Sequence, residues 1–241
     1  MPNTHHPAIA SEQRLIMALD VPDTQQARHL VTALADQVGF YKVGMELFMN
    51  GDCFSFIDWL KAQGKQVFVD LKFFDIPATV GRAIAALSAK GVDFATVHGN
   101  DAIIEAAVAN KGGLGVLAVT CLTSLDRGDL DDLGFQCDVE ALVYSRAKRA
   151  LALGCDGVVS SGLEAKRLRA DLGSRLLIVT PGVRPVENRV EDDQKRVVTV
   201  TDALSFGADY IVVGRPIRDA ADPKAAARAI QDQIAAVFTS A

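Results

Sequence analysis

Short apolar runs alternate with amphipathic segments along the whole chain. The runs are dense in Val, Ile and Leu, which is typical of parallel strands that are buried on both faces. They predict eight strands, at residues 14–20, 41–46, 66–72, 94–99, 115–122, 157–162, 176–184 and 210–217.

Helical patterns lie in the intervals between these runs. After a helix start signal at residues 22–24, apolar residues recur at helical spacing through residues 27–38. Similar apolar faces follow Pro77 and Pro223, and another covers residues 142–151. The hydrophobic period therefore switches repeatedly between that of a strand and that of a helix.

A Gly-x-Asp triplet recurs three times between a helical pattern and a strand, at residues 91–93, 154–156 and 207–209. Glycine in that place can adopt the left-handed conformation that ends a helix. Eight βα units predict an α/β fold with one domain, a (β/α)8 or TIM barrel over residues 1–241, in which residues 1–11 form a loose tail. A doubly wound open sheet is the alternative, because periodicity alone cannot show that a sheet closes.

Two polar segments are too long to be simple turns. Residues 123–138 follow the fifth strand and residues 184–196 follow the seventh. In a barrel both lie on the face where these enzymes keep their active sites. We expect long loops in both places, and we expect the second to act as a lid over the site.

Charged residues gather near the ends of the first three predicted strands. Asp70 and Lys72 share one face of the third strand because side chains alternate along it. Lys42 on the second strand and Asp20 at the end of the first come to the same end of the barrel. Such charges are costly to bury unless they are paired, so the cluster favours a functional site over a purely structural ion-pair network.

The loops after the seventh and eighth predicted strands have the character of a phosphate site. Gly182 and Gly214 allow backbone N–H groups to approach a ligand, and Arg184 and Arg215 offer guanidinium groups. A phosphorylated small molecule is therefore the expected ligand. The alternative for Arg184 is an exposed surface charge.

Composition narrows the function further. The chain has 25 Lys and Arg against 30 Asp and Glu, a net charge of −5, which argues against nucleic acid as a partner. No stretch is long and apolar enough to span a membrane, and the four cysteines lack the spacing of a zinc, redox or disulfide framework. The cysteine pattern predicts a cytoplasmic protein. No His and carboxylate cluster has the spacing of a catalytic zinc site.

These residues together give a resemblance to a known family. Over nearly its whole length the sequence resembles the bacterial orotidine 5′-phosphate decarboxylases. The likeness is carried by LIMALD ending at Asp20, FYKVGMELF around Lys42, DLKFFDIPATV from Asp70 to Val80, TVHG at His98, VTCLTS ending at Ser124, TPGVR ending at Arg184, DDQKRV around Gln194, and GADYIVVGRPI through Arg215.

The resemblance implies that orotidine 5′-phosphate loses CO2 without a cofactor and becomes uridine 5′-phosphate (UMP), a step of de novo pyrimidine biosynthesis. It assigns an alternating array to Lys42, Asp70, Lys72 and Asp75, the last from the partner of a homodimer, with Lys72 as the proton donor. It assigns substrate binding to Asp20, Lys42, Asp70, Thr79 of the partner, Thr123, Arg184, Gln194, Gly214 and Arg215.

Two other functions remain open at this point. A wider group of barrel enzymes, magnesium-dependent sugar-phosphate decarboxylases, aldolases and synthases, is similar around the Asp-x-Lys-x-x-Asp pattern of residues 70–75. Ile76, Pro77 and the segment around Gln194 favour the orotidine member. A protein that only binds a nucleotide phosphate is the third hypothesis.

Overall fold

Eight parallel strands close into one barrel in the computed structural model, which describes residues 9–184 and 197–239. The strands pair in chain order, and β1 pairs with β8 to complete the ring. They are β1 Leu15–Ala18, β2 Phe40–Gly44, β3 Gln66–Phe73, β4 Phe94–His98, β5 Gly115–Val119, β6 Gly157–Val159, β7 Leu177–Thr180 and β8 Tyr210–Val213. The predicted (β/α)8 barrel is confirmed and the open sheet is excluded.

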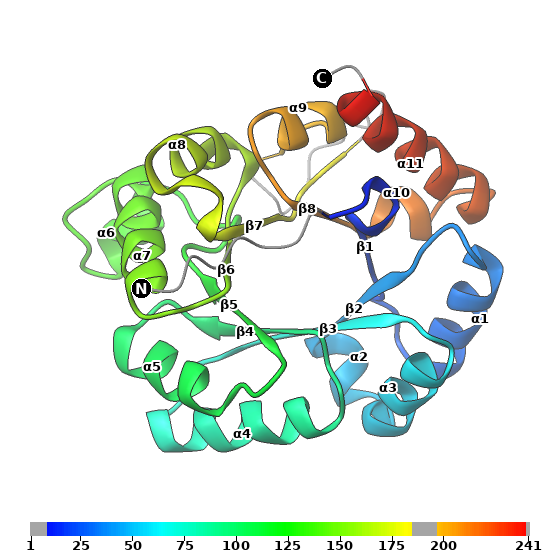
Figure 1. Cartoon of the computed structure of the whole chain (residues 1–241), viewed down its shortest axis with the longest axis horizontal. Coiled ribbons are helices and arrows are strands. Elements are labelled where there is room, and N and C mark those ends of the chain that lie inside the picture. The colour runs from blue at the N-terminus through cyan, green and yellow to red at the C-terminus, as the bar shows by residue number, and fades with distance from the viewer. Residues whose placement is uncertain (1–8, 185–196, 240–241) are drawn as a thin grey trace.

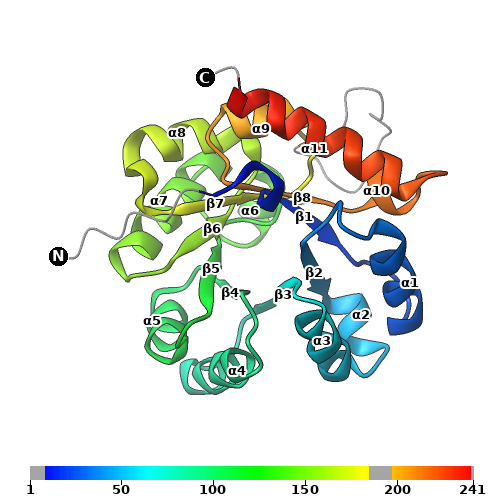
Figure 2. The same ribbon diagram turned by 45° about the vertical axis from the view of Figure 1, so that its right-hand side comes forward.

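Helices surround the barrel (Figure 1). They are α1 Thr24–Leu34, α2 Met45–Met49, α3 Cys53–Ala62, α4 Pro77–Ala89, α5 Asp101–Asn110, α6 Arg127–Asp132, α7 Val139–Ala152, α8 Gly162–Leu172, α9 Val200–Ser205, α10 Arg215–Arg218 and α11 Pro223–Thr239, with short 3₁₀ helices at Ser11–Gln13 and Gly173–Arg175. The last helix, α11, packs beside α1, and α4 packs beside α5 (Figure 2). In the described part of the chain, no helix is long and apolar enough to cross a membrane.

Side-chain alternation along the strands divides the core into two layers. Leu15 and Met17 of β1 join the large cluster between strands and helices, whereas Ile16 and Ala18 point into the barrel. Four aromatic residues fill the barrel interior and contact one another with ring centroids 5.3–6.3 Å apart: Phe40, Phe68, Phe94 and Tyr210. They form an apolar floor one strand repeat below Lys42 and Asp70.

The three Gly-x-Asp triplets have a common structure at the N-terminal end of the barrel. Each glycine has a positive φ, as predicted, and each aspartate accepts a backbone N–H from the strand before the helix while pairing with a basic side chain. We call these groups the basal clamps. Their members are Asp93 with Lys61 and Val67, Asp156 with Lys111 and Val116, and Asp209 with Arg169 and Ile178.

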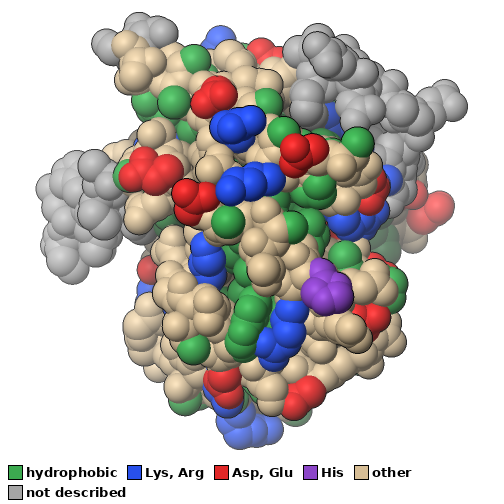
Figure 3. Space-filling view, turned by 90° about the vertical axis from the view of Figure 1, so that its right-hand side faces the viewer, with side chains coloured by type: hydrophobic (Ala, Val, Ile, Leu, Met, Phe, Trp, Pro, Cys, Tyr) green, Lys and Arg blue, Asp and Glu red, His purple; other side chains and the backbone are tan. Residues whose placement is uncertain are grey.

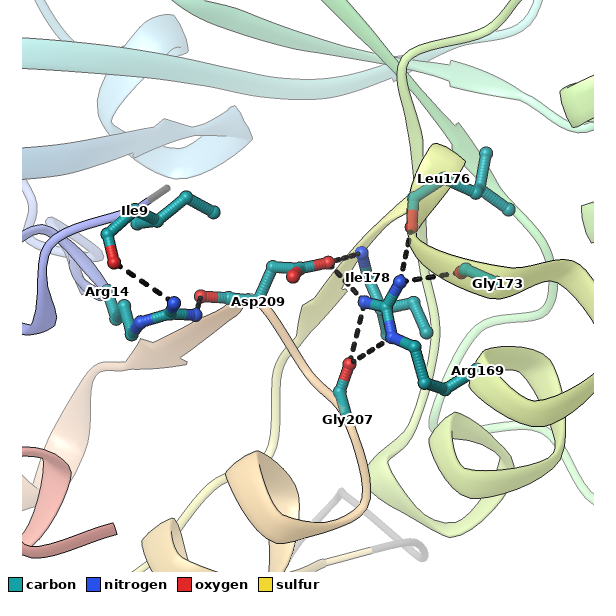
Figure 4. Close-up of polar contacts among 8 residues, drawn as sticks. All are labelled: Ile9, Arg14, Arg169, Gly173, Leu176, Ile178, Gly207 and Asp209. Carbon is teal, nitrogen blue, oxygen red and sulfur yellow. Dashed lines mark hydrogen bonds and ion pairs between the residues drawn. The ribbon is translucent and has the colours of Figure 1, made fainter. Parts of the chain in front are cut away.

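The third basal clamp also holds the N-terminal segment (Figure 4). The Asp209 carboxylate accepts from Arg169 Nη2 at 2.5 Å and from Ile178 N at 2.8 Å, and its carbonyl accepts from Arg14 Nη1 at 3.0 Å. Arg14 donates in turn to the carbonyl of Ile9 at 3.0 Å. Within the predicted tail 1–11, residues 9–11 are therefore attached to the barrel, and residues 1–8 lie outside the described part.

Some predicted boundaries are wrong. Residues 123–138 are not one long loop, because Asp126 caps the short helix α6 through a capping box and Leu130 is fully buried. Residues 214–217 are not strand, since β8 ends at Val213 and Arg215 begins α10. The strand predicted over residues 210–217 was too long because the end of a strand and the first turn of a helix can have the same apolar pattern.

Candidate active site

A cavity of about 530 Å³ opens at the C-terminal ends of the strands. This volume suits a small organic ligand. Eight of the residues predicted for the site line it: Asp20, Lys42, Asp70, Lys72, Thr123, Arg184, Gly214 and Arg215.

The third strand carries two charged side chains into this cavity, but it is irregular where it does so. Val69 pairs with Ala95 of β4, and the next paired position joins Phe73 to Val97. Three residues of β3 therefore lie opposite Thr96 alone. Lys72 has φ 49°, a left-handed conformation that is costly for a residue with a side chain. The bulge turns Lys72 towards the cavity beside Asp70.

Four side chains form a chain of alternating charge, which we call the charge cluster: Asp20, Lys42, Asp70 and Lys72. Lys42 Nζ lies 3.0 Å from Asp20 Oδ1 and 3.7 Å from Asp70 Oδ2. Lys72 Nζ lies 2.9 Å from Asp70 Oδ1. The inner pair, Lys42 and Asp70, is buried, while Asp20 and Lys72 are partly open to solvent. The outer members thus face the space that a ligand would fill.

Electrostatics keep the inner pair ionised. Burial alone would raise the pKa of Asp70, but Lys42, Lys72 and the Thr96 hydroxyl outweigh it and hold this pKa below its usual range. Burial would lower the pKa of Lys42, and Asp70 and Asp20 together raise it above its usual value. A fixed cation and a fixed anion therefore lie side by side above the apolar floor.

The part of the cavity lining that follows β7 and β8 is cationic. Arg184 follows β7 and Arg215 begins α10 after β8. Burial, and then the neighbouring charge of Arg215, lower the pKa of Arg184. Two guanidinium groups that repel each other at one cavity are stabilised when an anion binds both. The geometry suits a phosphate group on this side.

Two predicted site residues do not line the cavity of their own chain. Asp75 lies in the loop between β3 and α4 with an exposed side chain, whose Oδ1 accepts from Ile76 N at 2.6 Å. Thr79 lies in the first turn of α4 and accepts from Arg82 at 3.3 Å. Gln194 and most of the predicted lid, residues 185–196, lie outside the described residues.

Four further residues, which were not predicted from the sequence, shape the site. Thr96 contacts Asp70, Glu46 lines the cavity, and Arg218 Nη1 donates to the Asp20 carbonyl at 2.6 Å. Gly44 packs so tightly that a Cβ there would lie 2.9 Å from Lys42 Nζ and 3.0 Å from Asp20 Oδ1. A signal existed for Thr96, a polar residue at an inward position of β4.

His98, two residues beyond Thr96, is not among the cavity-lining residues. Its ring packs against that of Phe74 at a tilt of 31°, with centroids 4.3 Å apart, and its Nδ1 lies 2.8 Å from Asn100 Oδ1. Over residues 9–184 and 197–239, no group of three or more His, Cys, Asp or Glu side chains is arranged to hold a metal ion.

Comparison with known proteins identifies the family of the chain. A model of the orotidine 5′-phosphate decarboxylase / HUMPS family matches residues 13–230. The orotidine 5′-phosphate decarboxylase of Methylococcus capsulatus is 68% identical over 241 residues, covering 100% of both chains, and that of Stenotrophomonas maltophilia is 51% identical over 234 residues, covering 96% of this chain and 97% of the relative.

A solved structure extends the likeness to three dimensions. The crystal structure of orotidine 5′-phosphate decarboxylase from Lactobacillus acidophilus matches with a TM-score of 0.82 and 37% sequence identity, covering 92% of this chain and 99% of that one. Sequence and fold are thus similar over nearly the full length of each relative. The chain belongs to the orotidine 5′-phosphate decarboxylase / HUMPS family.

Proposed function

We propose that the protein is a carboxy-lyase that converts orotidine 5′-phosphate to UMP, the decarboxylation step of pyrimidine biosynthesis, without a metal or organic cofactor. Its full-length relatives are named for this activity. The observation that carries the proposal is the charge cluster, in which Lys72 Nζ lies 2.9 Å from Asp70 Oδ1, in a cavity that Arg184 and Arg215 also line.

In the proposed reaction the bond between the pyrimidine ring and its carboxylate breaks, CO2 leaves, and the electron pair stays on the ring carbon. Lys72 donates a proton to that carbon. Asp70 faces the departing carboxylate, and Lys42 holds Asp70 in place. The net change is loss of CO2 and gain of one proton, with no oxidation or reduction.

Repulsion by Asp70 can supply only part of the rate enhancement. Two like charges about 4 Å apart repel by roughly 4 kcal/mol at an effective dielectric near 20, whereas enzymes commonly lower barriers by about 8 to 23 kcal/mol. The larger share belongs to a preorganised Lys72 ammonium beside the developing carbanion. The apolar floor beneath Lys42 and Asp70 strengthens this interaction by excluding water.

The substrate is oriented by two groups of cavity-lining residues, the charge cluster and the residues that follow β7 and β8. Arg184, Gly214 and Arg215 bind the phosphate, and Asp20 and Lys42 bind the ribose hydroxyls. Thr123 binds the pyrimidine, Asp70 contacts the substrate at its carboxylate, and Gln194 completes the phosphate side. Phosphate binding far from the reacting carbon contributes energy to orient the ring, as remote binding does in other enzymes.

A homodimer completes the site, with Asp75 and Thr79 reaching the substrate of the partner subunit. Support comes from the loop that carries Asp75. Phe74 and Ile76 on either side of it are each 66% exposed. Adjacent exposed apolar side chains beside a charged one are typical of a surface that a second subunit covers.

The competing magnesium-dependent function fits the donor set less well. Asp70 contacts two ammonium groups and Asp20 contacts one, so a magnesium ion would compete with Lys42 and Lys72 for the same carboxylate oxygens.

A cytoplasmic location is supported by the four free cysteines, three of them buried, which suit a reducing compartment.

The test is direct. Purified protein treated with a chelator is assayed with orotidine 5′-phosphate, and UMP and CO2 are measured. We expect metal-free turnover that Lys72→Ala abolishes while the variant still binds UMP. Turnover of keto-sugar phosphates that returns only with Mg²⁺ would favour the competing enzyme. Nucleotide binding with no reaction in the wild type would favour a binding protein.

A further inference from the structure

We propose that Thr96 is a positioning residue, whose buried hydroxyl fixes both the Asp70 carboxylate and the bulged backbone of Lys72. The inference rests on the proposed function of the charge cluster, and it adds a residue that acts on the reaction only through its neighbours.

The hydroxyl of Thr96 makes two contacts with β3. It donates to Asp70 Oδ1 at 2.9 Å and accepts from the Lys72 backbone N–H at 2.9 Å. The side chain lies on β4, is fully buried and shares the inward strand face of Phe94. A hydroxyl has one proton and two lone pairs, so one group can serve both partners at once.

The backbone contact compensates for the irregular pairing of the two strands. Between the Val69–Ala95 and Phe73–Val97 pairs, β3 is two residues longer than β4. The Lys72 N–H therefore bonds to a side chain rather than to a backbone carbonyl. Since Lys72 also has φ 49°, this bond stabilises a conformation that a lysine rarely adopts.

The carboxylate contact selects the orientation of Asp70. Its Oδ1 receives both the Thr96 hydroxyl and the Lys72 ammonium, at 2.9 Å each, while its Oδ2 faces Lys42 at 3.7 Å. Rotation of the carboxylate would break the contact with Thr96. Thr96 thus determines which oxygen meets Lys72 and where the ammonium lies.

Few other groups act on Asp70. The charged groups in contact with it are Lys42 on β2 and Lys72 on β3. Asp20, which follows β1, contacts Lys42 and acts on Asp70 through it. The neutral hydroxyl of Thr96 contacts Asp70 from β4. Loss of the hydroxyl removes one hydrogen bond to the ionised carboxylate, which raises its pKa.

The experiment compares two variants of Thr96. Thr96→Val keeps the shape of the side chain and removes the hydroxyl, whereas Thr96→Ser keeps the hydroxyl. Thr180→Val is the matched control, because Thr180 is also fully buried on a strand and its hydroxyl has no partner among the described residues. Steady-state kinetics over a pH series and thermal unfolding are measured for each. Thr96→Cys, a weak donor, replaces Thr96→Val should that variant not fold.

We expect Thr96→Val to lower kcat by about 10- to 100-fold with KM changed by less than about threefold, and the acidic limb of its pH profile to move upward. Thr96→Ser is expected within about threefold of wild type, and Thr180→Val unchanged. An unaltered kcat and pH profile in Thr96→Val, or an equal defect in Thr96→Ser, would overturn the proposal.

Failure of the proposed function would be recognised separately, as absence of turnover in the wild type. Carboxyl NMR of Asp70 tests Thr96 even then. A higher Asp70 pKa in Thr96→Val than in wild type would support the role, and an identical pKa would refute it.

Discussion

Lys42 Nζ lies 3.7 Å from Asp70 Oδ2, and only 10% and 13% of the two side chains are exposed. A buried pair of this kind is costly to break, because removing one partner leaves the other charge uncompensated. The pair links stability to the same charges that we assign to catalysis.

Asp70→Asn is expected to lower the free energy of unfolding by about 3 kcal/mol at neutral pH and to abolish decarboxylation. Although burial opposes it, the contacts with Lys42, Lys72 and Thr96 depress the pKa of Asp70. Its contribution is therefore present above the usual carboxyl pKa and is lost as the pH falls through the depressed value. Urea unfolding should show a constant difference from about pH 5 to 8 that shrinks below about pH 4.

The exposed Asp232→Asn on α11 is the control for that series. A difference between wild type and Asp70→Asn that stays the same at every pH would contradict the linkage.

Gly44→Ala is expected to lower kcat by about 10- to 100-fold while the protein still folds. The added Cβ would lie 2.9 Å from Lys42 Nζ. The end of the lysine side chain can shift away at small cost to stability, but the shift moves Nζ out of its position in the charge cluster. Gly39→Ala, just before the other end of β2 and with no atom within 4 Å of the added Cβ, is the matched control. Equal kinetics for the two variants would argue against a role for the Lys42 position.

Arg215→Ala is expected to reduce kcat/KM for orotidine 5′-phosphate by about 100-fold or more, since a charge-assisted phosphate contact is lost. Turnover of the nucleoside orotidine, which has no phosphate, should hardly change. Parallel assays of both substrates measure this, with the exposed Arg228→Ala on α11 as the control. A similar loss for nucleotide and nucleoside would place Arg215 away from the phosphate.

Mixing inactive Asp75→Ala and Lys72→Ala proteins is expected to restore activity to roughly a quarter of wild type or less, because a heterodimer assembles one intact site of two. Ile76→Glu should instead give inactive monomers by sedimentation. Leu163→Glu, on an apolar residue of α8 that is 57% exposed, is the control and should remain dimeric. No regained activity after proven subunit exchange would mean that each site is self-contained.

Asp209→Ala is expected to lower the free energy of unfolding by about 2 to 4 kcal/mol, because Arg169 and the Ile178 N–H lose their shared acceptor. The basal clamp lies at the end of the barrel away from the charge cluster, so kcat should be unaffected. Denaturant unfolding and steady-state kinetics measure both, with Asp232→Ala as the control. A large fall in kcat without loss of stability would contradict this division between the two ends.

Much of the site followed from local rules. Side-chain alternation along β3 predicted that Asp70 points into the barrel and Val69 towards the helices. In the structure Asp70 lines the cavity and Val69 belongs to the core between strands and helices. The glycines at positions 91, 154 and 207 have the positive φ that their place after a helix predicted. These features depend on a few neighbouring residues, and the sequence contains that information directly.

The sequence by itself determined the order of strands and helices, the inward position of the charged residues and the family. Only the tertiary structure decided that β1 pairs with β8, that Lys72 adopts φ 49°, and that Thr96 bonds to both Asp70 and Lys72. Closure and the bulge depend on the register between strands that are distant in sequence, and register is set by packing across the whole barrel. A periodic pattern within one strand carries no record of it.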